Sequence, residues 1–213
     1  MLPYTRFTII GPQGSGKGTQ AKFLAERLGV RHVSTGDMFR HHVSQGTELG
    51  KQVDVLLKAG SLVPDEVTNM MITERLVKPD VAPGFVLDGY PRNVVQAEFL
   101  GTIALEVQAI ELQLTDAEAV RRIAGRRVCQ KCGANFHLEF APPRVADACD
   151  SCGGELVQRA DDTEAAVRAR LATYHRETEP LLTYYRSRGT LTVVDGAPPI
   201  PKVTAAVRIA LGL

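Results

Sequence analysis

Residues 7–28 read FTIIGPQGSGKGTQAKFLAERL, and this stretch carries most of the information about the fold. Its first four residues, 7–10, form a short apolar run that stops at Gly11. From residue 19 to residue 28 the apolar side chains recur at helical spacing, and Gly29 follows as a typical helix end. The sequence therefore predicts a strand and a helix joined by a glycine-rich loop, the context in which phosphate-binding loops occur.

The loop itself, GPQGSGKGT at residues 11–19, has the G-x4-G-K spacing of a Walker A motif. Glycines allow backbone N–H groups to converge on phosphate oxygens, while the helix N-terminus and Lys17 add positive potential. Ser or Thr usually follows the lysine, but here Gly18 does, and a threonine comes one residue later. A glycine-rich turn without a ligand is disfavoured because spacing and context agree. The candidate phosphate-binding residues are Gly14, Ser15, Gly16, Lys17, Gly18 and Thr19.

The composition places the chain among globular proteins and argues against several functions. Of 213 residues, 44% are hydrophobic and 23% are charged, which is atypical of disordered or fibrous proteins. Lys and Arg total 25 against 24 for Asp and Glu, so the net charge of +1 lacks the excess typical of a nucleic-acid coat. No apolar run approaches the roughly 20 residues of a membrane span, and residues 7–10 are too few for a signal-peptide core. We expect a cytoplasmic protein that binds neither nucleic acid nor membranes.

Strand-like and helical patterns alternate along most of the chain. Further buried strands are predicted at residues 85–87, 109–114 and 191–194. Between them lie helical patterns, one opening with the capping box TDAE at 115–118 and one over 163–188 that Pro180 should bend. Such alternation predicts an α/β fold with a mostly parallel sheet covered by helices on both faces.

Two segments interrupt this alternation. Residues 34–63 contain helical patterns without a convincing core strand, and residues 126–162 are rich in Gly, Pro and Cys. Both are interpreted as insertions into an α/β core. The predicted core comprises residues 1–33, 64–125 and 163–213.

All four cysteines lie in the second insertion. Their pattern, C-x2-C-x16-C-x2-C, is a strong signature of a zinc site whose ligands are Cys129, Cys132, Cys149 and Cys152. Because protein ligands would fill every position around the ion, the site should be structural. Two disulfides or unbound thiols are the less favoured alternatives in the cytosol, and another metal such as iron remains open.

Three stretches, GKGTQ at 16–20, STGDMFR at 34–40 and DGYPRN at 88–93, resemble the nucleoside monophosphate kinases, most closely the long-lid adenylate kinases of bacteria. The resemblance runs in order over essentially the whole chain. It implies a P-loop three-layer core with a five-stranded parallel sheet, a helical NMP-binding insert (34–63) and a zinc-binding lid (126–162). It also implies a monomer that reversibly transfers the terminal phosphoryl group from MgATP to AMP, giving two ADP, for adenine nucleotide homeostasis.

The resemblance also implies roles for charged residues. Moving a phosphoryl group between nucleotides gathers negative charge, which arginine forks neutralise bidentately. Arg40 and Arg92 would hold the acceptor monophosphate, and Asp88 would bind Mg²⁺ through water. Asp161 and Asp162 are expected to form a charge pair at a helix start with hinge salt bridges. The candidate catalytic residues are Lys17, Arg92, Arg122, Arg126, Arg159 and Arg170.

Base recognition is inferred from the same resemblance. The implied AMP contacts are Thr35, Arg40, Ser61, Leu62, Val63, Gly89, Tyr90, Pro91, Arg92, Gln96, Arg159 and Arg170. Gln96 can read an adenine edge through its two-sided amide. Thr35 resembles the AMP-selecting form, whereas Asn93 is typical of pyrimidine-specific relatives. The implied ATP contacts beyond the glycine-rich loop are Arg122, Arg126, Asn135, Phe136 and Pro198.

Two alternatives remain open at this point. A UMP/CMP kinase would use the same chemistry on a different acceptor, and Asn93 favours it. A nucleotide-switched P-loop core with a zinc ribbon would bind nucleic acid without catalysis. The near-neutral charge and the full arginine set argue against that second alternative.

Overall fold

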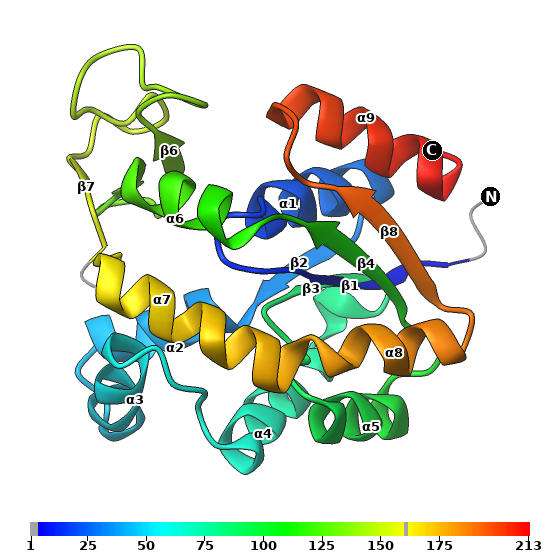
Figure 1. Ribbon diagram of the computed structural model, residues 1–213. Helices are drawn as coiled ribbons and strands as arrows, with labels where there is room; N and C mark the ends of the chain where they lie inside the picture. Colours follow the sequence, from blue (N-terminus) through cyan, green and yellow to red (C-terminus); the bar gives the residue numbers. More distant parts are fainter. Residues whose placement is uncertain (1–3, 160–161) are drawn as a thin grey trace.

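The core of the protein is a five-stranded parallel sheet, as the resemblance implied, and its strand order is β2-β3-β1-β4-β8. The computed structural model describes residues 4–159 and 162–213 (Figure 1). The strands are β1 (Arg6–Ile10), β2 (Arg31–Ser34), β3 (Phe85–Asp88), β4 (Gln108–Gln113) and β8 (Leu191–Asp195). Residue patterns alone missed the edge strand β2, because RHVS contains a single apolar side chain, the buried Val33.

Helices cover both faces of this sheet (Figure 1). One face packs against α1 (Lys17–Leu28) and α9 (Ile200–Leu211), and the other packs against α4 (Asp65–Leu76), α5 (Val94–Ile103) and α8 (Pro180–Ser187). Strand residues such as Ile9 and Leu87 are 2% and 0% exposed, which explains why the strands read as continuous apolar runs. The short 3-10 helix Pro79–Val81 leads into β3.

The helix before the second insertion begins at a side-chain cap, and the helical pattern after that insertion is interrupted. Thr115 Oγ1 accepts a hydrogen bond from Glu118 N at the start of α6 (Asp116–Ala124), as the capping box predicted. The long helical pattern over 163–188 is divided into α7 (Glu164–Thr173), a π-helical turn (Tyr174–Thr178) and α8. The helix is therefore interrupted just before Pro180, where the sequence predicts a bend. Proline lacks the backbone N–H that would continue the α-helical hydrogen bonds.

Segment 34–63 is helical after Ser34, the last residue of β2. Its helices are α2 (Thr35–Ser44) and α3 (Glu48–Lys58), capped by the side chains of Ser34 and Thr47. A small apolar cluster holds them against α4 and contains Phe39, Val53, Val63 and Met71.

Segment 126–162 carries a second, antiparallel sheet, set apart from the core in Figure 1. Its strands β5 (Arg126–Cys129), β6 (Asn135–His137) and β7 (Leu156–Val157) lie in the order β6-β5-β7. The apolar centre of this unit is small and consists mainly of Cys129, Cys149 and Leu156. Within the described residues, no helix is long and apolar enough to cross a membrane.

Candidate active site

The glycine-rich loop follows β1 and ends where α1 begins. Gly14 and Gly16 have φ values of 80° and 90°, a left-handed conformation that side chains with a Cβ rarely adopt. Lys17, the first residue of α1, folds back so that Nζ donates to the carbonyl oxygens of Gly11 and Pro12, both at 2.7 Å. Burial lowers the pKa of Lys17 to about 8, although the nearby Asp88 carboxylate opposes the shift. The ammonium is therefore held in a site with little water to stabilise its charge.

Asp88 ends β3 beside this loop, because the carboxyl ends of parallel strands share one edge of the sheet. Burial alone would raise the pKa of its carboxyl group, but the neighbouring His32 ring and Lys17 hold that pKa below its usual value. His32 Nε2 lies 3.5 Å from Asp88 Oδ2. A Cβ at Gly18 would lie 3.2 Å from the same oxygen, so the glycine that replaces Ser or Thr leaves room for this carboxylate.

A cavity of about 720 Å³ extends from the loop to both insertions. This is the volume expected of a site for small molecules. Its lining includes the predicted residues Gly14, Gly16, Lys17, Gly18, Thr19, Thr35, Arg40, Ser61, Leu62, Val63, Asp88, Gly89, Pro91, Arg92, Gln96, Arg122, Arg126, Asn135, Phe136, Arg159, Arg170 and Pro198. The fold therefore brings residues from distant parts of the sequence to one space.

Two predicted residues are buried rather than placed in the lining. Ser15 is 1% exposed, within the loop. Tyr90 is fully buried among the core side chains, and its hydroxyl donates to Asn69 Oδ1 at 2.6 Å and lies 3.2 Å from the Gln96 carbonyl oxygen. The Tyr90 side chain therefore supports the structure around the cavity instead of facing it.

A buried carboxylate joins two of the predicted catalytic arginines. The side chain of Asp162 is 0% exposed and accepts from Arg126 Nε at 2.8 Å and from a second Arg126 nitrogen. Arg170 Nη2 lies 3.3 Å from the same carboxylate. The expected hinge salt bridges are thus present at Asp162, while Asp161 lies outside the described residues. Because Arg126 begins β5 and Arg170 is on α7, the carboxylate connects the second insertion to the core.

Polar and charged side chains also line the part of the cavity that is predicted to bind the acceptor monophosphate. Arg92 Nε donates to the Gly89 carbonyl at 2.8 Å, and Thr35 Oγ1 donates to the same oxygen at 2.9 Å. Asp37 pairs with Arg40 at 2.5 Å, and its backbone N–H donates to the helix-capping Ser34 Oγ. Asp37 therefore has two roles within α2 itself.

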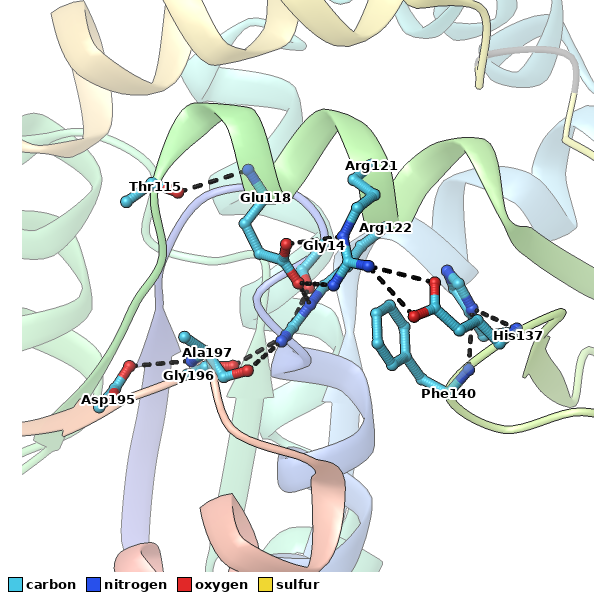
Figure 2. A network of polar contacts seen from close by, with 11 residues as sticks. Gly14, Thr115, Glu118, Arg121, Arg122, His137, Phe140, Asp195, Gly196 and Ala197 are labelled. Carbon is cyan, nitrogen blue, oxygen red and sulfur yellow. Dashed lines mark hydrogen bonds and ion pairs between the residues drawn. The ribbon is translucent and has the colours of Figure 1, made fainter.

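Figure 2 shows how Arg122 connects α6 to the glycine-rich loop and to the segment that follows β8. Its guanidinium donates to the carbonyls of Gly196 at 2.8 Å and Ala197 at 2.5 Å, and pairs with Glu118 at 2.8 Å. Glu118 therefore binds arginines with its carboxylate instead of completing the capping box. Arg122 also lies 5.3 Å from the centre of the Phe140 ring.

Phe140 and His137 line the cavity although sequence reasoning did not select them. Their ring centres are 4.5 Å apart, and Arg121, which pairs with Glu139, lies 4.8 Å from the centre of the Phe140 ring. His137 Nδ1 accepts from the backbone N–H groups of Glu139 and Phe140, while its buried Nε2 has no hydrogen-bond partner within the described chain. The available signal was the aromatic-rich stretch FHLEF at residues 136–140.

The side chains of Gln96, Asn93 and Asp65 form a hydrogen-bonded network next to the cavity. Gln96 Oε1 accepts from Arg92 N at 2.7 Å, and Gln96 Nε2 donates to Asp65 Oδ1 at 2.7 Å. Asn93 caps α5 by accepting from Gln96 N at 2.8 Å, and its Nδ2 donates to both Asp65 oxygens. Asn93 therefore has a structural role that does not depend on the acceptor base.

The four cysteine sulfurs form a compact cluster. All four lie within 4.8 Å of one another, and the pairs Cys129–Cys152 and Cys132–Cys149 are 3.5 and 3.6 Å apart. Four thiolates around zinc would be about 3.8 Å apart, given Zn–S bonds of about 2.3 Å. The donor set and its spacing therefore fit a tetrahedral metal site, and the sulfurs are too far apart for disulfides.

Comparison with known proteins agrees with this geometry. Residues 9–190 match the family model described as adenylate kinase. The chain is 49% identical to the adenylate kinase of Moorella thermoacetica, over 97% of this chain and 98% of that protein. It is 50% identical to that of Symbiobacterium thermophilum (95% and 96% covered) and 48% identical to that of Streptomyces griseus (97% of each). The chain therefore belongs to the adenylate kinase family, phosphotransferases that convert ATP and AMP reversibly into two molecules of ADP.

Proposed function

We propose that Lys17 and the arginines around the cavity are the catalytic machinery of this chain. The observation that carries the proposal is their convergence on one cavity from the loop, the β3–α5 connection, α6, the second insertion and α7. The acceptor is already a phosphate anion, so no general base is required. Catalysis then consists of alignment, neutralisation of charge and exclusion of water. The residues in this role are Lys17, Arg92, Arg122, Arg126, Arg159 and Arg170.

We assign the donor ATP to the side of the cavity formed by the glycine-rich loop, Arg122, Arg126, Asn135, Phe136 and Pro198. The backbone N–H groups from Gly14 to Thr19 hold its phosphates. The Arg122 guanidinium and the Phe140 ring offer flat surfaces for its adenine. Mg²⁺ bound with ATP neutralises phosphate charge, and Asp88 holds it through water.

The acceptor AMP is assigned to the opposite side. Arg40 and Arg92 bind its phosphate, and Arg159 and Arg170 contact it at the point of transfer. Thr35 and Gln96 face its base, with Ser61, Leu62 and Val63 closing over it. Segments 34–63 and 126–162 are proposed as the two units that close on the nucleotides around the remaining core. We further propose a cytoplasmic monomer that does not bind nucleic acid, in which zinc holds the second segment together.

A coupled phosphotransfer assay with MgATP and AMP, CMP, UMP or GMP tests this proposal. We expect a strong preference for AMP, because a site that hydrogen-bonds one base leaves buried polar groups unpaired with another. Asn93 was the residue that favoured the alternative UMP/CMP kinase. Its side chain donates to Asp65 and caps the start of α5, so its presence is explained without a pyrimidine acceptor. Comparable kcat/KM values for AMP and either pyrimidine nucleotide would contradict the assignment of the acceptor.

A further inference from the structure

The network around Gln96 fixes which way its amide faces. Gln96 is 1% exposed, and each end of its amide meets a partner of fixed polarity. A backbone N–H can only donate, so the atom 2.7 Å from Arg92 N must be the amide oxygen. An ionised carboxylate can only accept, so the atom 2.7 Å from Asp65 Oδ1 must be the amide nitrogen. Turning the amide over would place donor against donor and acceptor against acceptor.

This arrangement leaves a defined pattern for a ligand. An amide oxygen accepts two hydrogen bonds and an amide nitrogen donates two, and the network uses one of each. One donor and one acceptor therefore remain on a side chain that lines the cavity. Together they match a base edge with an amino group beside an unprotonated ring nitrogen, as in a 6-amino purine. A 6-oxo purine presents the reverse pattern, a carbonyl beside a ring N–H.

We propose that Asp65 is a positioning residue that locks the Gln96 amide and thereby makes the acceptor site select 6-amino over 6-oxo purine nucleotides. The proposal rests on the assignment of Gln96 to the acceptor base made above. Asp65 does not line the main cavity and acts only through Gln96. Asn93 fixes the Asp65 carboxylate in turn, because its Nδ2 donates to both Asp65 oxygens at 2.9 and 3.1 Å.

The first test uses the unmodified protein with three acceptors: AMP, IMP and purine riboside 5′-monophosphate, which lacks the 6-substituent. With a locked amide, purine riboside monophosphate loses one hydrogen bond, whereas IMP meets two mismatched groups. We therefore expect kcat/KM in the order AMP, purine riboside monophosphate, IMP, with IMP roughly tenfold or more below the second. IMP equal to or better than purine riboside monophosphate would show that the amide turns freely and would overturn the lock. Failure to phosphorylate AMP at all would instead reject the proposed function.

The second test compares Asp65→Asn with Asp65→Glu. Asparagine has nearly the same shape but presents either polarity, so the AMP/IMP ratio of kcat/KM should fall roughly tenfold. Glutamate keeps an acceptor-only carboxylate and should retain most of the ratio even where overall efficiency drops. Glu66→Gln, the exposed neighbour on the same helical turn, is the matched control and should leave the ratio unchanged. Equal AMP/IMP ratios in the Asn and Glu variants, both folded by circular dichroism, would assign Asp65 a merely structural role.

Discussion

At the scale of single residues, Lys17 shows how function opposes stability. The helix start and the loop bury an ammonium group, and this burial lowers its pKa to about 8. Two of its three N–H donors are directed at carbonyl oxygens of its own loop, both at 2.7 Å. Phosphate oxygens carry more negative charge than those carbonyls, so a bound nucleotide stabilises the protonated lysine more strongly.

Proton uptake should therefore accompany MgATP binding in mildly alkaline solution. Below pH 8, Lys17 is already charged in the free protein, and binding needs no proton. Above pH 8 the free lysine is neutral, so affinity should fall by up to about tenfold per pH unit as the pH rises. Titration calorimetry between pH 7 and 9.5, in buffers with different ionisation heats, measures both effects. Lys17→Met should bind more weakly with a flat pH profile, and a pH-independent affinity in the unmodified protein would refute this account.

Loss of a phosphate-binding arginine should reduce turnover far more than stability. Arg92→Ala removes charge beside the acceptor, and the range for removing an arginine in related phosphoryl transfer is roughly 10³–10⁵ in kcat. Arg168→Ala is the matched control, because Arg168 is exposed and pairs with Glu164 within α7. Steady-state kinetics at saturating nucleotide, with thermal unfolding in parallel, gives both quantities. Near-normal kcat for Arg92→Ala would remove it from the catalytic set.

At the scale of elements, the sequence predicts best where a local pattern carries the information. The strand–loop–helix around Lys17, the cap at Thr115 and the interruption before Pro180 all follow local rules. Patterns failed at β2, which has one buried apolar residue, and in the second insertion, whose strands span two to four residues. Sequence patterns did not single out Asp65, because acidic residues are common in the first turn of a helix. Its partner Gln96 lies 31 positions further along the sequence.

The second insertion is the element whose stability should depend on metal. Its apolar centre is small, so four thiolates around zinc would supply much of its folding free energy. Purified protein should contain about one zinc per chain by elemental analysis. Cys129→Ser should lower the melting temperature of this segment, whereas Ser151→Ala, an exposed position between two of the cysteines, should not. Metal-free protein with four titratable thiols and unchanged melting would reject a structural metal site.

At the scale of the whole molecule, Arg170 lies where the three parts of the chain meet. Its guanidinium contacts Asp162, which also binds Arg126 at the start of the second insertion. Its aliphatic stem passes close to Gly60 in the first insertion, where an added Cβ would lie 2.8 Å from Arg170 Cγ. The position of Arg170, one of the proposed catalytic arginines, thus depends on both insertions and on α7, a dependence that no local pattern could predict.

Gly60→Ala should therefore impair catalysis as well as stability. Gly60 has φ 71°, so alanine is strained there by about 1–2 kcal/mol, and its methyl group would also displace Arg170. Gly46→Ala provides the matched control, because Gly46 lies in the same insertion with φ 62° and nothing within 4 Å of an added Cβ. Gly60→Ala should lose more free energy of unfolding in urea than Gly46→Ala, because its Cβ would also lie 3.2 Å from the Ala166 carbonyl oxygen. Only Gly60→Ala should lower kcat, because only there does the new side chain reach a proposed catalytic group. Equal kcat values in the two variants would mean that the contact with Gly60 does not position Arg170.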